Sequence, residues 1–155
     1  MSKSTISKKI LFWYDNNKRI LPWRKNISKE QKLYFTLVSE FMLQQTQVST
    51  VIPYFKRFVQ KIPNFKKLSK ANDQTLMKLW EGLGYYSRAR NLKRSAIMIN
   101  GKFGGILPSN FEDLKSLPGV GDYTSTAIMA IAFNEKFIPL DGNIERILKR
   151  VLFLR

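Results

Sequence analysis

Two acidic residues stand out in the sequence because their surroundings differ. Glu40 lies among apolar residues, on a helix that is otherwise built to be buried. A carboxylate in such a place is either a structural acid that caps a helix or pairs with a lysine, or it has a raised pKa and holds a proton near neutral pH. Asp141 precedes the last predicted helix, where it either serves as an N-cap or stabilises positive charge in a cleft. An acid that keeps its proton and a carboxylate that stays charged together suit general-acid chemistry.

The chain is strongly basic. Its 155 residues include 27 Lys+Arg and 11 Asp+Glu, for a formal net charge of +16. This charge predicts attraction to a polyanion such as nucleic acid, although a proteome rich in Lys, Ile and Asn also produces basic proteins without a binding role. The sequence has no Cys and no His, so this chain by itself offers no disulfide, no thiolate or histidine catalysis, and no Cys or His ligands for a zinc or iron–sulfur cluster. Without a secretion signal or an apolar span of about 20 residues, we expect an intracellular, cytoplasmic protein with no membrane partner.

The segment Leu117-Pro118-Gly119-Val120-Gly121 predicts a tight turn between two short helices. Pro118 fixes φ, and the two glycines permit positive φ and a close approach of the backbone to a ligand. Such a turn points the free N–H groups at the start of the next helix outward, toward a phosphate oxygen, without reading a base. We therefore expect Gly119, Val120 and Gly121 to contact DNA phosphates. The alternative is a helix–helix turn that binds nothing.

Two further clusters have the composition of a surface that enters a base stack. Gln44 and Gln45 end the Glu40 helix, and their amides are poor core groups but good donors and acceptors for base edges. The segment 82–90 combines a glycine turn, paired tyrosines and arginines, which suits both phosphate contact and wedging between bases. We expect Tyr85 and Arg88 to contact DNA. The alternative for this segment is a helix cap followed by core aromatic residues.

The elements that must position these residues are helices, because apolar residues recur at helical spacing and no segment alternates like a strand. We expect an all-α fold in one unit. In the helix that begins at Ser87, we place Arg88 on the outer face, opposite Ala89, Leu92, Ala96 and Ile97. Pro53 is expected in the first turn of the third helix, and Ser109 is expected to cap the helix at 111–116. The expected helices run from Ile6 through Tyr14, at Leu33–Gln44, from Pro53 through Val59, from Asn72 or Asp73 to Trp80, and at Ser87–Asn100, Phe111–Ser116, Asp122–Phe133 and Ile144 to about Phe153.

Four strings in this order resemble the MutY-type adenine DNA glycosylases of the helix-hairpin-helix glycosylase superfamily: SEFMLQQTQVSTVIPYF, LWEGLGYYSRARNL, LPGVGDYTSTAI and PLDGNIERIL. The similarity runs from about Ile10 to the end of the sequence. The first two strings distinguish this branch from the endonuclease III branch. The resemblance implies the helix-hairpin-helix glycosylase fold over residues 1–155, with the hairpin motif at about 110–133. It also implies hydrolysis of the bond between deoxyribose and an adenine mispaired with 8-oxoguanine or guanine.

The resemblance also implies roles for individual residues. Glu40 matches the acid that protonates the departing adenine, and Asp141 matches the carboxylate that stabilises the oxocarbenium-like sugar. Paired carboxylates in unlike environments are what this cleavage needs. The remaining matches are the active-site residues Asn143 and Tyr123, the residues Gln45 and Tyr85 that enter the base stack, and the adenine-pocket residues Trp23 and Arg24. The sequence spacing from Trp23 and Arg24 to Glu40 is longer here than in the family pattern.

The resemblance has further implications for partners and cofactors. Bifunctional relatives carry a nucleophilic lysine where this chain has Tyr123, so we expect a monofunctional enzyme. The family's [4Fe–4S] cluster uses four cysteines beyond the region covered, so we expect a chain truncated at its C-terminus, with no cofactor unless a cysteine-bearing extension exists. The expected partner is double-stranded DNA with a mispaired adenine, bound by a monomer associated with the nucleoid. The alternatives are a glycosylase for another mismatched base and a non-catalytic DNA-binding module.

Overall fold

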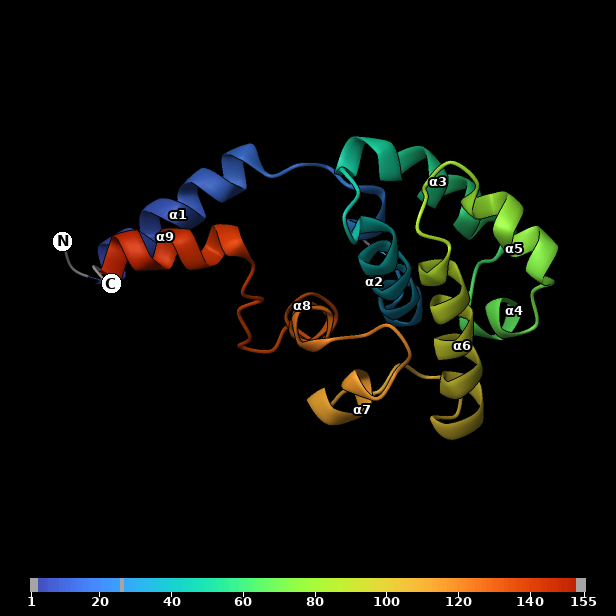
Figure 1. Ribbon diagram of the computed structural model, residues 1–155. Helices are drawn as coiled ribbons and strands as arrows, with labels where there is room; N and C mark the ends of the chain where they lie inside the picture. Colours follow the sequence, from blue (N-terminus) through green and yellow to red (C-terminus); the bar gives the residue numbers. More distant parts are fainter. Residues whose placement is uncertain (1–2, 26, 153–155) are drawn as a thin grey trace.

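The computed structural model describes residues 3–25 and 27–152, and within these ranges the chain forms helices and loops with no strand (Figure 1). This confirms the all-α prediction. The elements are α1 (Lys3–Asn17), the short 3-10 helix η1 (Pro22–Arg24), α2 (Lys29–Leu43), α3 (Val48–Lys61), α4 (Phe65–Ser69), α5 (Asp73–Trp80), α6 (Ser87–Lys102), α7 (Phe111–Lys115), α8 (Asp122–Ala132) and α9 (Gly142–Leu152).

The helix α2 lies at the centre of the molecule. It contacts α3, α6 and α8, and Figure 1 shows α2 between α8 on one side and α6 on the other. Its residues Leu37, Val38, Phe41 and Met42 are fully buried. Burying an apolar side chain of this size contributes about 1.5–3 kcal/mol, so packing holds the backbone of α2 firmly in place.

Side-chain caps begin five of the described helices, four of them α2, α4, α5 and α7 and the fifth α9. Ser28, Asn64, Asn72 and Asn110 each accept a hydrogen bond from a backbone N–H in the first turn of the helix that follows. Asn72 is one of the two residues predicted to cap α5. The cap of α7 is Asn110 rather than the predicted Ser109.

Two expectations about the helices are corrected. Pro53 was expected in the first turn of its helix, but α3 begins at Val48 and places Pro53 in its interior. The helix continues through this residue because the apolar face of α3, with Val51, Phe55 and Phe58 buried, supplies packing that offsets the missing hydrogen bond. The short helix α4 at Phe65–Ser69 was not predicted, since one turn and a half is too short to show a period.

Helices α1 and α9 differ from the rest because their large apolar side chains are exposed. Phe12 and Trp13 on α1 and Ile147 on α9 are each more than half exposed, and α9 has no buried residue. The described helices include none that is long and apolar enough to cross a membrane.

Candidate active site

Glu40 lies near the C-terminal end of α2, next to the buried residues Ser39 and Phe41. Burial raises the pKa of Glu40 to about 7, and the positive charge of Arg24 opposes this rise. The described residues provide its carboxyl group with neither a salt bridge nor a hydrogen bond that would favour the charged form. Of the two alternatives for Glu40, the structure therefore favours an acid that retains its proton near neutral pH over a structural acid held by a lysine.

A cavity of about 420 Å³ lies along α2, and Glu40 is not among the residues that line it. Thr36, one helical turn before Glu40, lines this cavity together with Trp23, Arg24 and Ile131. Trp23 is buried and its ring packs edge-on against Phe55, with the ring centroids 5.1 Å apart. The structure thus brings Trp23 and Arg24 to a cavity near Glu40. The longer spacing in the sequence does not keep them away from α2.

Asp141 is the N-cap of α9. Its Oδ1 accepts hydrogen bonds from the backbone N–H groups of Ile144 at 2.7 Å and Asn143 at 3.0 Å. The hydrogen bond from Ile144 is the main reason why the pKa of Asp141 is lowered, and the Asn143 side chain and the charge of Arg146 act in the same direction. The N-cap role is confirmed, and the same hydrogen bonds keep the carboxylate charged at neutral pH.

The hydroxyl of Tyr123 is influenced by the charges of both acids. Tyr123 is in the first turn of α8 and 47% exposed. Burial raises the pKa of its hydroxyl, and the charges of Glu40 and Asp141 both raise it further. Because both carboxyl groups act on one hydroxyl, the acid on α2 and the carboxylate before α9 lie within electrostatic reach of the same point. Asn143 is farther out, where its side chain is exposed and its Oδ1 accepts a hydrogen bond from Arg146 at 3.0 Å.

The turn between α7 and α8 is built largely as predicted, with two differences. Gly119 has a positive φ of +80°, but φ of Gly121 is −94°, which any residue adopts. The N–H of Val120 is not free for phosphate, since it donates to the carbonyl oxygen of Leu117 at 3.0 Å, and its side chain is buried. The start of α8 has no side-chain cap, so its first N–H groups remain the anion-binding feature of this turn.

Hydrogen bonds from α6 and from the end of α2 hold this turn in place. Ser95 on α6 donates a hydrogen bond to the carbonyl oxygen of Pro118 at 2.9 Å. The Gln44 side chain donates to the carbonyl oxygen of Gly119 at 3.3 Å. A Cβ atom on Gly119 would lie 2.8 Å from the Cβ of Asn91, so the turn also needs glycine for its close approach to α6. Neither Asn91 nor Ser95 was predicted from the sequence to support the turn.

Gln45 and Tyr85 occupy two exposed loops, as residues that enter a base stack must. Both have positive φ, 57° and 49°, which is uncommon for residues other than glycine and costs about 1–3 kcal/mol each. Tyr85 is 60% exposed. The strain is the kind of feature found at functional sites.

Arg88 contradicts its prediction as a phosphate contact on the outer face of its helix. It is only 7% exposed, and its guanidinium donates to backbone carbonyl oxygens of both loops. Three of the four residues predicted for the apolar face of α6 are buried as expected, namely Ala89, Leu92 and Ala96, whereas Ile97 is half exposed. The error concerned Arg88, which lies on this buried side of the helix together with Ser95 and Ile99. The sequence did contain a signal for a polar stripe on the inner face of the helix. It is the spacing of Arg88, Asn91 and Ser95 at positions i, i+3 and i+7, which places them on one side of a helix.

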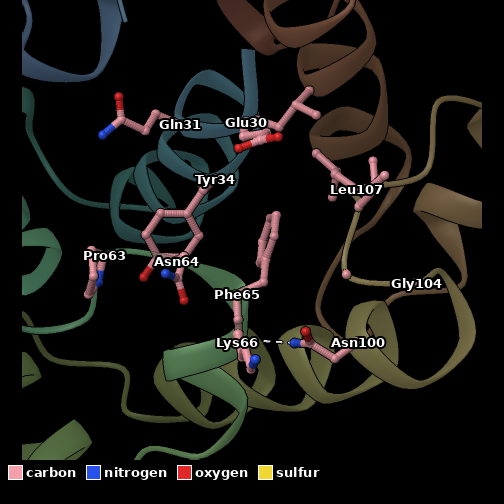
Figure 2. Close-up of a pocket in the computed structure, with 13 residues that line it drawn as sticks. Glu30, Gln31, Tyr34, Pro63, Asn64, Phe65, Lys66, Asn100, Gly104 and Leu107 are labelled. Atoms are coloured by element: carbon pink, nitrogen blue, oxygen red, sulfur yellow. Dashed lines mark hydrogen bonds between the residues drawn. The ribbon is translucent and has the colours of Figure 1, made fainter. Parts of the chain in front are cut away.

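A separate hollow of about 480 Å³ lies at the other end of α2 (Figure 2). Glu30 and Tyr34 from α2, Phe65 and Lys66 from α4 and Asn100 from α6 surround it. The polar groups around it are bound to the fold itself: Tyr34 donates to the carbonyl oxygen of Ile62 at 2.5 Å, and Asn100 donates to that of Phe65 at 3.0 Å. None of the predicted site residues lines this hollow.

Comparisons with known proteins agree with this architecture. The family model of the HhH-GPD superfamily base excision DNA repair proteins matches residues 38–155. A solved structure of a thermostable thymine-DNA glycosylase is similar with a TM-score of 0.84 and 28% identity, over 94% of this chain and 66% of that one. An endonuclease III–DNA complex shares the fold, with a TM-score of 0.78 at 22% identity, over 100% of this chain and 71% of that one. The chain belongs to the HhH-GPD superfamily.

Within that superfamily, the chain is similar to proteins named adenine DNA glycosylase. It is 48% identical to the protein of Rattus norvegicus over 92% of this chain and 28% of that protein. The identity to the protein of Buchnera aphidicola subsp. Acyrthosiphon pisum is 43%, over 97% of this chain and 42% of that protein. The human protein is 46% identical over 92% of this chain and 27% of that protein. The chain thus spans less than half the length of these relatives.

The iron–sulfur cluster that the family resemblance implies has no ligands in this chain. The sequence contains no Cys and no His. The part of the chain that the structure describes has no group of three or more acidic side chains that could hold a metal ion either. The donor atoms of this chain do not fit the cluster.

Proposed function

We propose that this chain is the catalytic region of an adenine DNA glycosylase that hydrolyses the N-glycosidic bond of adenine opposite 8-oxoguanine or guanine. The observation that carries the proposal is the contrast between its two acids: Glu40, one helical turn after the cavity-lining Thr36, has its pKa raised to about 7, and Asp141 has its pKa lowered. This contrast is what a departing base and a developing sugar cation need. The similarity to adenine DNA glycosylases supplies the identity of the base.

The proposed reaction follows from these positions. An adenine flipped out of the duplex enters the cavity lined by Trp23 and Arg24. Glu40 gives its proton to a ring nitrogen of the base, the bond to the sugar C1′ breaks, and its electron pair leaves with the adenine. The negative charge of Asp141 stabilises the oxocarbenium-like sugar. Water then adds to C1′, and its proton returns to the Glu40 carboxylate, so the acid is regenerated.

The DNA duplex lies, in this proposal, across the start of α8 and the loops that carry Gln45 and Tyr85. The turn at Gly119–Gly121 binds phosphate through backbone N–H groups at the start of α8, and the net charge of +16 adds sequence-independent attraction. Gln45 and Tyr85 fill the gap that the flipped base leaves. Since the proposed substrate is chromosomal DNA, we place the protein inside the cell at the nucleoid, acting as a monomer.

We also propose that the enzyme is monofunctional. The residue at the start of α8 on which both acids act electrostatically is Tyr123, where bifunctional relatives carry a lysine. Borohydride treatment during the reaction is therefore expected to trap little covalent protein–DNA adduct. Efficient trapping, mapped to a lysine, would show that an amine attacks the sugar.

Base release from defined duplexes tests the proposed function. The chain, in excess, is incubated with four duplexes. These contain adenine opposite 8-oxoguanine, adenine opposite guanine, thymine opposite guanine, and a matched adenine–thymine pair. We expect free adenine from the first two duplexes only, and none with Glu40→Gln. Release of thymine instead would assign the chain to the activity named for its structural relative. Tight binding of all duplexes without release of any base would identify a non-catalytic DNA-binding module.

A further inference from the structure

Arg88 binds both of the loops that carry Gln45 and Tyr85. Its Nη1 donates hydrogen bonds to backbone carbonyl oxygens at the end of α2, those of Phe41 at 3.2 Å, Met42 at 2.9 Å and Gln44. Its Nη2 donates to Thr46 Oγ1 at 3.2 Å and to the carbonyl oxygens of Leu83 at 3.1 Å and Gly84 at 3.2 Å. One planar guanidinium therefore joins the loop after α2 to the loop before α6.

The end of α2 requires such a donor. The last carbonyl groups of a helix have no partner within the helix, and the negative end of its dipole attracts a cation. Arg88 supplies both the hydrogen bonds and the charge from a different helix. No carboxylate forms a salt bridge with Arg88 in the described ranges, and its charge faces carbonyl dipoles and the rings of Trp80 and Tyr85 at 5.7 and 5.3 Å.

The two strained residues adjoin these hydrogen bonds. Gln45 lies between Gln44 and Thr46, both bound by Arg88, and Tyr85 follows Gly84, which Arg88 also binds. A positive φ at residues other than glycine persists only where the surrounding structure holds it. A lysine in place of Arg88 has one ammonium group instead of two nitrogens in a fixed plane, so it cannot bind both loops in the same geometry.

We propose that Arg88 is a positioning residue that fixes the spacing of Gln45 and Tyr85, so that the two side chains enter the base stack as one unit. The proposal rests on the proposed function, because the stack is that of the DNA substrate. In this proposal Arg88 itself contacts no DNA, since Nη1 and Nη2 donate to the end of α2 and to the two loops, and its side chain is buried.

The first experiment uses the free protein. In Arg88→Lys, we expect the backbone amide NMR signals of Gln45 and Tyr85 to shift or broaden together, while signals of α4 and α9 stay in place. Arg94→Lys is the matched control, because Arg94 is exposed on the same helix and the substitution is the same. Unchanged signals at both loop residues in Arg88→Lys would overturn the proposal. If that variant does not fold, Thr46→Val removes one bond to Nη2 and is expected to shift the same two signals.

The second experiment measures insertion into DNA. A duplex with adenine opposite 8-oxoguanine carries 2-aminopurine beside the mismatch. The fluorescence of 2-aminopurine rises when the side chains of Gln45 and Tyr85 unstack this base. We expect a several-fold smaller rise with Arg88→Lys than with wild type or Arg94→Lys at saturating protein. The slope of log affinity against log salt should stay unchanged, since no phosphate contact is lost. Arg88→Lys and Tyr85→Ala combined should reduce the rise no further than Tyr85→Ala alone.

These outcomes separate the two proposals. Additive effects of the two substitutions on the fluorescence rise would overturn the positioning role of Arg88. No fluorescence rise and no base release with the wild-type protein would contradict the proposed function alone. In that case, the NMR comparison of Arg88→Lys with Arg94→Lys still decides whether Arg88 fixes the two loops.

Discussion

The side-chain amide of Gln44 donates hydrogen bonds to the carbonyl oxygen of Gly119 at 3.3 Å and to Thr124 Oγ1 at 3.4 Å. These bonds join the end of α2 to the turn before α8, over more than 70 residues of sequence. Gln44 was expected to reach base edges, but in this position its amide faces the protein. Gln45, the exposed neighbour, is the glutamine that faces away from it.

Gln44→Leu is therefore expected to lower the free energy of unfolding by about 1 kcal/mol, because it removes these two hydrogen bonds. Gln45→Leu should leave stability unchanged within error, since its side chain is exposed. Urea unfolding of the two variants side by side measures the difference. Equal stability of both variants would mean that the bonds of Gln44 contribute nothing.

Glu40→Gln is expected to stabilise the protein at alkaline pH. The folded state holds the Glu40 proton up to about pH 7, whereas an unfolded glutamate releases it near its ordinary value of 4.5. The folded state then binds more protons between these values, so the stability of the wild type falls as pH rises through this window. The amide removes this loss, which is up to about 3 kcal/mol. Melting at pH 5 and pH 8 should show a gain at pH 8 and little at pH 5. A gain of equal size at both pH values would contradict the raised pKa.

The rate of base release should fall as pH rises above about 7, because only protonated Glu40 can give a proton to the adenine. Single-turnover rates with saturating protein measure this without interference from product release. DNA affinity, measured in the same buffers, serves as the control and should not follow the same profile. A rate that is constant from pH 6 to pH 9 would assign the acid role to another group.

Asp141 permits its two roles to be separated. Asparagine is as good an N-cap as aspartate, so Asp141→Asn should keep α9 intact while it removes the charge beside the sugar. Asp141→Ala removes both. We expect both variants to lose adenine release, and only the alanine variant to lose helix content and melt earlier. Near wild-type release by Asp141→Asn would leave Asp141 with the structural role alone.

The two glycines of the hairpin turn should respond differently to valine. Gly119→Val must adopt a φ of +80° and meets Asn91, so we expect a loss of stability of at least about 1–2 kcal/mol. At Gly121, φ is −94° and no described atom lies within 4 Å of an added Cβ, so Gly121→Val should fold normally. Its branched side chain should instead weaken binding to mispaired and undamaged duplexes alike, as fluorescence anisotropy would show. A folded Gly121→Val protein with normal affinity would remove this turn from the DNA interface.

The sequence was a good guide where local chemistry decides the structure. The N-cap position of Asp141 follows from its place before an apolar helix, and the turn at Gly119 follows from a glycine beside a proline. The raised pKa of Glu40 also follows from its apolar neighbours on a buried helix. In each of these cases, the residues that determine the outcome lie within one or two turns in the sequence.

Arg88 shows why the partners of a polar side chain were not accessible from sequence, even where its spacing with Asn91 and Ser95 indicates a polar stripe on the helix. An arginine in a +16 chain is most simply placed outward, toward a phosphate. Its actual partners are backbone carbonyl oxygens at 41–44 and 83–84, and carbonyl groups leave no trace in residue identity. Only the crossing of α2 and α6 brings them together. The same reason hides Ser95, whose partner is the carbonyl oxygen of Pro118.

The carbonyl contacts of Arg88, Ser95 and Gln44 have a consequence for variation in this scaffold. Every amino acid carries the same carbonyl oxygen, so these anchors place few demands on the side chains of the loops they hold. The exposed tips at Gln45 and Tyr85 can therefore exchange one side chain for another that adopts a positive φ while the loop paths stay fixed. The framework and its exposed tips are, in this sense, separate modules, and a library of substitutions at these two positions would present new side chains on an unchanged support.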